Sequence, residues 1–165
     1  MILGMTTLTF VHVVISLIGI LSGFVVVFGL LTARRMDGWT ATFLSATIAT
    51  SATGFLFFSF DKFLPSHAVG ILSLVVLALA TFGRYARHLA GAWNSIYAIG
   101  AVLALYLNVF VLIVQLFLKV PALKALAPTQ TEMPFKLVQL AVLLLFVVLG
   151  IFSTIRFRQQ QLRPA

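Results

Sequence analysis

Long apolar runs alternate with short polar segments along the whole chain. A bilayer core of about 30 Å is crossed by roughly 20 apolar residues in an α-helix. Five runs come close to that length or exceed it, and they cover residues 10–31, 40–60, 68–85, 93–118 and 137–155. The pattern therefore predicts an all-α protein, a polytopic membrane bundle of five transmembrane helices that forms a single domain over residues 1–165.

Composition agrees with this prediction and excludes other classes. Of the 165 residues 62% are apolar and only 8% are charged, whereas soluble domains carry about a quarter charged residues. The chain has no cysteine, so a disulfide framework and thiolate chemistry are excluded. The net charge of +8 does not indicate nucleic-acid binding, because the cations lie between the apolar runs.

The cations divide by type between the two ends of the predicted helices, and this division predicts the orientation. One end holds seven arginines, which are Arg34, Arg35, Arg84, Arg87, Arg156, Arg158 and Arg163. The other end holds four lysines, which are Lys62, Lys119, Lys124 and Lys136. Since the more cationic end faces the cytoplasm, we expect the N-terminus outside and the C-terminus inside. Trp39, Tyr85 and Trp93 are then expected in an aromatic belt at the cytoplasmic interface.

Small residues recur at helical spacing in the first two runs. Gly19 and Gly23 form a GxxxG pair, and Ala46, Thr50 and Gly54 follow one another at four-residue intervals. Because helices in lipid associate where their backbones approach closely, these faces are expected to pack as an antiparallel hairpin. A ligand-lining role is the alternative.

The fourth run carries a polar stripe. Gly100, Ala104 and Asn108 recur every four residues, Gln115 lies two turns beyond, and Tyr97 adds a hydroxyl near the inner end. An amide at membrane depth is unfavourable towards lipid. Asn108 is therefore expected to join helices, with Thr47 or Thr50 as its partner, or else to line a path for a small substrate.

Two of the three histidines fall in the same outer zone of the predicted topology. His12 lies one turn into the first run, and His67 opens the third run after Pro65. Imidazoles from two helices are able to hold a haem b iron axially, and the outer methionines Met1, Met5 and Met133 extend this to a soft-ligand set for copper. The alternative is that both are ordinary interfacial histidines, as His88 is expected to be.

Catalytic patterns are sparse. The acidic residues are Asp37, Asp61 and Glu132, all in predicted loops, so no carboxylate lies at membrane depth to relay protons. Asp61 is expected to pair with Lys62. No nucleophile–base pair or nucleotide-binding glycine pattern is present in the sequence.

Two segments carry a resemblance. Residues 108–129, which read NVFVLIVQLFLKVPALKALAPT, and the end of the second run, Thr53-Gly54-Phe55-Leu56-Phe57, resemble small bacterial inner-membrane proteins of uncharacterised function. Their helix pattern is distantly similar to that of cytochrome-b-like bundles. The resemblance implies a bacterial inner-membrane location and haem ligation by histidines on successive helices. In that pattern a histidine opens the second helix, where this chain has Gly38-Trp39-Thr40.

Three hypotheses follow. The first is a non-catalytic bundle component that acts by association with itself or with a partner membrane protein. The second is a haem or metal-binding redox protein that uses His12 and His67, and the third is a permease lined by the fourth run. The Pro-rich loop 119–136 is expected to meet an extracytoplasmic partner, and the basic tail 156–163 is expected to lie on anionic lipid.

Overall fold

The computed structural model describes residues 6–55 and 65–161, and these fold almost entirely into helices without any strand. The elements are α1 (Thr7–Leu31), α2 (Asp37–Gly54), α3 (Pro65–Thr81), the π-helical turn η2 (Phe82–Ala86), α4 (Trp93–Lys119), α5 (Pro121–Leu126) and α6 (Met133–Gln161). Each of the five predicted apolar runs coincides with a long helix. The expected pair Asp61–Lys62 and residues 56–60 of the second run lie outside the described residues.

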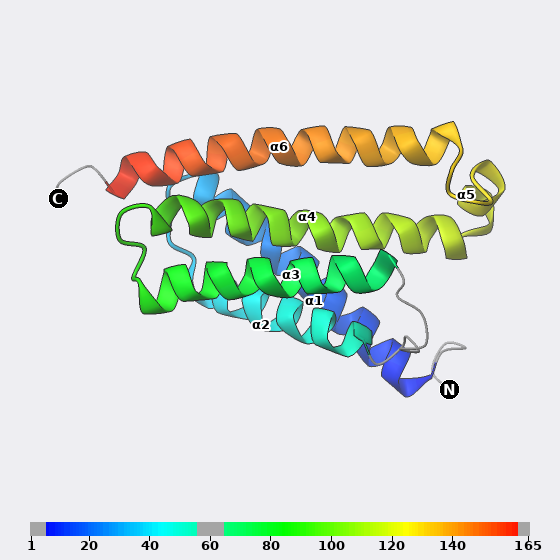
Figure 1. Cartoon of the computed structure of the whole chain (residues 1–165), viewed down its shortest axis with the longest axis horizontal. Helices are drawn as coiled ribbons and strands as arrows, with labels where there is room; N and C mark the ends of the chain where they lie inside the picture. The colour runs from blue at the N-terminus through cyan, green and yellow to red at the C-terminus, as the bar shows by residue number, and fades with distance from the viewer. Residues whose placement is uncertain (1–5, 56–64, 162–165) are drawn as a thin grey trace.

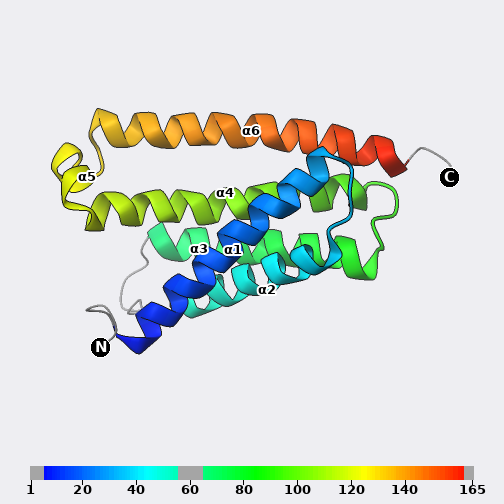
Figure 2. The same cartoon turned by 180° about the vertical axis from the view of Figure 1, so that it is seen from behind.

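Four long helices form a layer, and the fifth crosses it. In Figure 1, α2, α3, α4 and α6 lie side by side in that order, and each contacts its neighbour in the layer. Figure 2 shows α1 running obliquely over one side of this layer, where it contacts α2, α4 and α6. The first two helices therefore pack against each other, as the small-residue pattern predicts.

Four helices are long and apolar enough to cross a membrane: Thr7–Leu31, His67–Ala86, Trp93–Lys119 and Met133–Gln159. The chain thus has the composition of a multi-pass membrane protein. Helix α2 differs from these four, because its 18 residues rise only about 27 Å and include Asp37 and several hydroxyl side chains. It nevertheless lies beside the spanning helices in the same layer.

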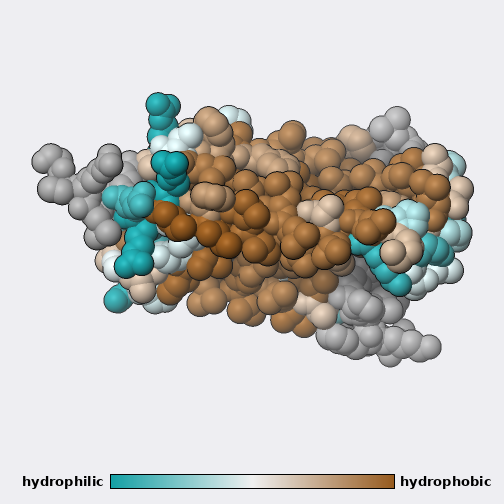
Figure 3. Space-filling model, turned by 90° about the horizontal axis from the view of Figure 1, so that it is seen from above, coloured by the Kyte–Doolittle hydropathy of each residue, from teal (hydrophilic) through white to brown (hydrophobic). Residues whose placement is uncertain are grey.

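The surface has an apolar band between two polar ends. In Figure 3 brown side chains cover the middle of the visible face and teal side chains gather at the ends. Large apolar side chains such as Leu21, Phe28 and Leu144 point outwards. A soluble protein would bury such residues, whereas a lipid solvent accepts them.

The loop between α4 and α6 is ordered by its own short helix and by one carboxylate. Pro121 begins α5, a position where its missing N–H is not needed. Glu132 then accepts hydrogen bonds from the backbone N–H and hydroxyl of Thr129 and from the backbone N–H of Thr131. Desolvation acts to raise the pKa of the Glu132 carboxyl, but these hydrogen bonds outweigh it, so the pKa is lowered.

Candidate functional site

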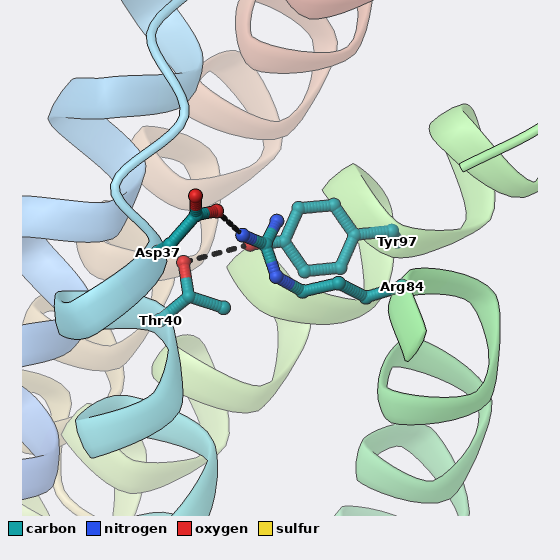
Figure 4. Close-up of polar contacts among 4 residues, drawn as sticks. All are labelled: Asp37, Thr40, Arg84 and Tyr97. Atoms are coloured by element: carbon teal, nitrogen blue, oxygen red, sulfur yellow. Dashed lines mark hydrogen bonds and ion pairs between the residues drawn. The ribbon is translucent and has the colours of Figure 1, made fainter. Parts of the chain in front are cut away.

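A cluster of polar side chains joins α2, η2 and α4 at the end of the bundle that carries the arginines. The Arg84 guanidinium forms an ion pair with the carboxylate of Asp37. It also lies 5.2 Å from the ring centroid of Tyr97, whose hydroxyl is 3.2 Å from Thr40 Oγ1 (Figure 4). The side chain of Arg84 is 8% exposed and that of Asp37 is 77% exposed, so a sheltered cation meets a solvated carboxylate.

The π-helical turn aims Arg84 into the bundle. In η2 the backbone N–H of Arg87 donates to the carbonyl of Phe82, five residues earlier, and π-turns of this kind are frequent at functional sites. Gly83 allows the turn to sit against α4, because a Cβ there would lie 3.1 Å from Trp93. From the sequence, Arg84 is expected only to interrupt the third span. Nothing in the sequence indicates that its side chain points into the bundle.

A left-handed turn brings Arg34 and Arg35 to the same end. Ala33 has φ 57°, and the backbone N–H of Arg34 donates back to the carbonyl of Gly29, which closes α1 as glycine-type helix ends do. A Cβ on Gly29 would lie 2.6 Å from Met36. The chain therefore folds tightly over Gly29 before α2 begins.

All described arginines gather at this end of the bundle, and the described lysines lie at the other. The arginines flank the ends of α1, η2 and α6 that Figure 1 shows together, and Lys119, Lys124 and Lys136 flank α5 at the opposite end. Trp39 and Tyr85 are each 51% exposed at the arginine end. This separation matches the one read from the sequence, while Lys62 and Arg163 lie outside the described residues.

Two hollows of the described chain adjoin the Arg84 cluster. One is a narrow crevice lined by Arg34, Arg35, Met36, Arg84 and Tyr97 together with apolar neighbours. The other is an open pocket of about 190 Å³. We refer to the latter as the arginine pocket, and its lining consists of Arg35, Asp37, Arg84, Tyr85, His88 and Leu89.

Deeper in the bundle, Asn108 joins three helices. Its Nδ2 donates to Thr47 Oγ1 over 3.2 Å, which is the bond expected from the sequence. A Cβ on Gly19 would lie 3.1 Å from Thr47 Oγ1 and 3.5 Å from Asn108 Nδ2. The absence of a side chain at Gly19 therefore lets α1 close over the bond between α2 and α4.

The other small residues of these faces also lie at contacts. A Cβ on Gly23 would meet Leu105 at 2.7 Å and Phe43 at 2.9 Å, and one on Gly100 would meet Ala80 at 3.2 Å. Ala46 packs near Gly19, and Ala104 is fully buried. Thr50 differs, because its hydroxyl is buried with no hydrogen-bond partner among the described residues.

The polar stripe of the fourth run does not extend as predicted. Gln115 lies in α4 but is exposed, so it does not continue the buried line through Asn108. Tyr97 is buried at the arginine end and bonds to Thr40. Gln115 shares one side of α4 with Asn108, as expected, but the helices packed around Asn108 do not cover it, so the stripe is exposed at this end.

His12 and His67, which the sequence predicts in one zone, both contact residues near the same end of α2. The Thr53 hydroxyl donates to the carbonyl of Ala49 and accepts from His12 Nδ1 over 2.8 Å. The ring of His67 stacks on Phe55 at a centroid separation of 6.0 Å.

His67 is only 5% exposed, so it is packed within the described chain and does not lie on its surface. Met1 and Met5 lie outside the described residues, and Met133 is exposed. No cluster of three or more metal-ligating His, Asp or Glu side chains is found in the described ranges. The two hollows described above lie at the arginine end of the bundle, away from these histidines.

Comparison of the chain with known protein families, with curated proteins and with solved structures finds no match.

Proposed function

We propose that this chain is a non-catalytic component of a bacterial inner membrane that acts by associating with a second copy of itself through α2. In this proposal all five long helices cross the bilayer, with the N-terminus outside and the arginine end in the cytoplasm. The arrangement of seven arginines against four lysines supports this orientation.

The observation that carries the proposal is the chemistry of the exposed side of α2. Its exposed residues beyond the first turn are Ala41, Thr42, Ser45, Ile48 and Ala52, which we call the α2 outer face. Ile48 is the one large apolar side chain among them. Four of the five are small, and two carry hydroxyls.

The other long helices expose a different surface. Helix α6 turns Leu140, Leu144, Val148 and Phe152 outwards, and α1 likewise exposes Leu, Val, Ile and Phe. Such side chains suit lipid tails, which offer no hydrogen bonds. A face of small and hydroxyl residues suits another helix instead, because it allows close backbone approach.

A second copy of the same chain fits this face better than a chemically different partner. Hydroxyls donate and accept at once, and a two-fold interface requires a surface that complements itself. Since the α2 outer face carries no charge, two copies meet without repulsion. Close approach of two copies across this face would also shield α2 from lipid, and α2 is the long described helix that is not apolar enough to count among the four candidate spans.

The polar groups inside the bundle support a structural role rather than a transport path. Asn108 bonds to Thr47, and Ser51 lies within hydrogen-bond distance of Ser73 at 2.9 Å. These contacts join α4 and α3 to α2. A permeation path would require these groups to face a water-filled lumen.

Single-cysteine cross-linking tests the proposal, and the chain is suited to it because it contains no native cysteine. Ser45→Cys puts a thiol on the α2 outer face, and Leu144→Cys puts one on the lipid-facing side of α6 as a matched control. Disulfides form only when the Cα atoms approach within about 7 Å. Under mild oxidation in native membranes we expect a disulfide-linked dimer from Ser45→Cys and little from Leu144→Cys. Equal yields from both, or none from Ser45→Cys, would contradict the proposal.

A further inference from the structure

We infer that the arginine pocket binds a phosphate group, carried either by an anionic lipid headgroup or by a free phosphate. The pocket lies between the start of α2 and the end of η2 and has a volume of about 190 Å³. That volume holds a phosphate group and the first atoms of the molecule that carries it.

The charges around the pocket favour an anion. Arg35 and Arg84 line it, and the acidic residue in its lining, Asp37, is paired with Arg84. Arg34 lines the adjoining crevice together with Arg35. The pocket region is therefore net positive, and Arg35 is exposed, so its planar guanidinium is accessible for the paired hydrogen bonds that phosphate oxygens accept.

The first turn of α2 adds a second source of positive potential. The N-cap residue, Met36, offers no side-chain hydrogen bond to the first amides of the helix. No atom lies within 4 Å of the Cβ position at Gly38, so the backbone there is open to approach. The start of an 18-residue helix carries a partial positive charge and N–H groups that suit phosphate, and the Asp37 carboxylate in this turn, which is paired with Arg84, offsets only part of that charge.

Arg84 is held in position beside the pocket, so its charge stays fixed when an anion arrives. Its guanidinium lies 5.2 Å from the centroid of Tyr97 and 5.8 Å from that of Tyr85. A side chain fixed by two rings and a carboxylate loses little conformational freedom when an anion arrives. Arg84 contributes to the positive electrostatic potential of the pocket, and Arg35 is the residue that we expect to donate hydrogen bonds to the phosphate.

The pocket also has the aromatic surroundings of a membrane interface. Tyr85 lines it, and the exposed Trp39 lies in the first turn of α2. Amphipathic rings prefer the headgroup level of a bilayer. A headgroup phosphate is thus present at this depth at high local concentration.

The test measures binding to the full-length protein in a neutral detergent by native mass spectrometry and by ligand titration. The probes are short-chain phosphatidylglycerol, inorganic phosphate and short-chain phosphatidylcholine. The test variant is Arg35→Gln. The control is Arg87→Gln, which removes the same charge from an exposed position at the same end but outside the pocket lining.

For Arg35→Gln we expect affinity for the binding anion to fall by on the order of tenfold, because the charge-assisted contact of the guanidinium is lost. For Arg87→Gln we expect a loss below about twofold, since a surface charge outside the pocket acts only through the screened field. Binding of phosphatidylglycerol alone identifies a lipid headgroup, and competition by inorganic phosphate identifies a free phosphate. Equal losses in both variants, binding of phosphatidylcholine as tight as that of phosphatidylglycerol, or no binding of either anion would overturn the inference.

Discussion

Replacement of Asn108 by leucine tests whether its amide holds the bundle together. The Asn108 Nδ2 donates to Thr47 Oγ1 over 3.2 Å, and Thr47 is fully buried. Leucine has the same branching and the same number of side-chain heavy atoms, so the main loss is the hydrogen bond rather than the packing around Gly19. The variant also leaves the Thr47 hydroxyl without its Asn108 partner.

The expected cost is about 1 kcal/mol of unfolding free energy. Hydrogen bonds between transmembrane helices contribute about 0.6 kcal/mol on average and up to about 1.7 kcal/mol. A value near the middle of that range applies here, because the bond is neutral and its length is at the upper end of the normal range. The loss of a buried partner for Thr47 places the value above the average.

The assay is a double-mutant cycle with Thr47→Val, in which unfolding free energies are read from helical circular dichroism in mixed micelles. If the bond is the interaction that matters, the two substitutions together cost less than the sum of their separate costs, by about 0.6–1 kcal/mol. The control is Gln115→Leu, which removes an exposed amide from the same helix and should change the stability by less than about 0.5 kcal/mol. A coupling energy indistinguishable from zero would refute the reasoning.

Three further predictions use the same measurement of unfolding free energy. Gly23→Ala should destabilise the bundle by about 1–3 kcal/mol, because the new methyl would lie 2.7 Å from a leucine of α4. Gly150→Ala is the control and should be tolerated, because the nearest neighbour of the new methyl would be 3.7 Å away; similar effects of the two substitutions would contradict this packing. Asp37→Asn should lower the unfolding free energy by about 1–2 kcal/mol, because it leaves the buried Arg84 without its carboxylate partner. The cost is limited because Asp37 is exposed and solvent screens its charge. An unchanged stability would show that the ion pair is dispensable. Glu132 has a lowered pKa in the folded protein, so its contribution is complete above 4.5, its ordinary value, and is lost as pH falls through the folded pKa. Glu132→Gln should therefore flatten the fall in stability below that pH, and a variant with the wild-type acid profile would contradict the assignment.

Much of the fold can be predicted from the sequence because lipid imposes a simple rule on it. Runs of about 20 apolar residues must form helices to satisfy their backbone, and each predicted run coincides with a helix. The bond between Asn108 and Thr47 was predictable for a related reason, since a buried amide in an apolar helix has few available partners.

The rest depends on local turns that hydropathy does not encode. The inward direction of Arg84 arises from one extra residue in the π-helical turn, and the position of Arg35 arises from the left-handed Ala33. Periodicity alone placed Gln115 on the buried stripe, but the helices packed around Asn108 do not cover it. Contacts between helices decide such positions, and one sequence does not specify them.

The oligomeric state of the protein in a bilayer is the most direct test of self-association through α2. Singly labelled protein is reconstituted at high lipid dilution, and photobleaching steps are counted for the wild type and for Ser45→Phe. The bulky ring blocks close approach across the α2 outer face while leaving the buried side of α2 unchanged. The account predicts mainly two bleaching steps for the wild type and one for the variant. A wild type that bleaches in one step, or a variant that still bleaches in two, would contradict it.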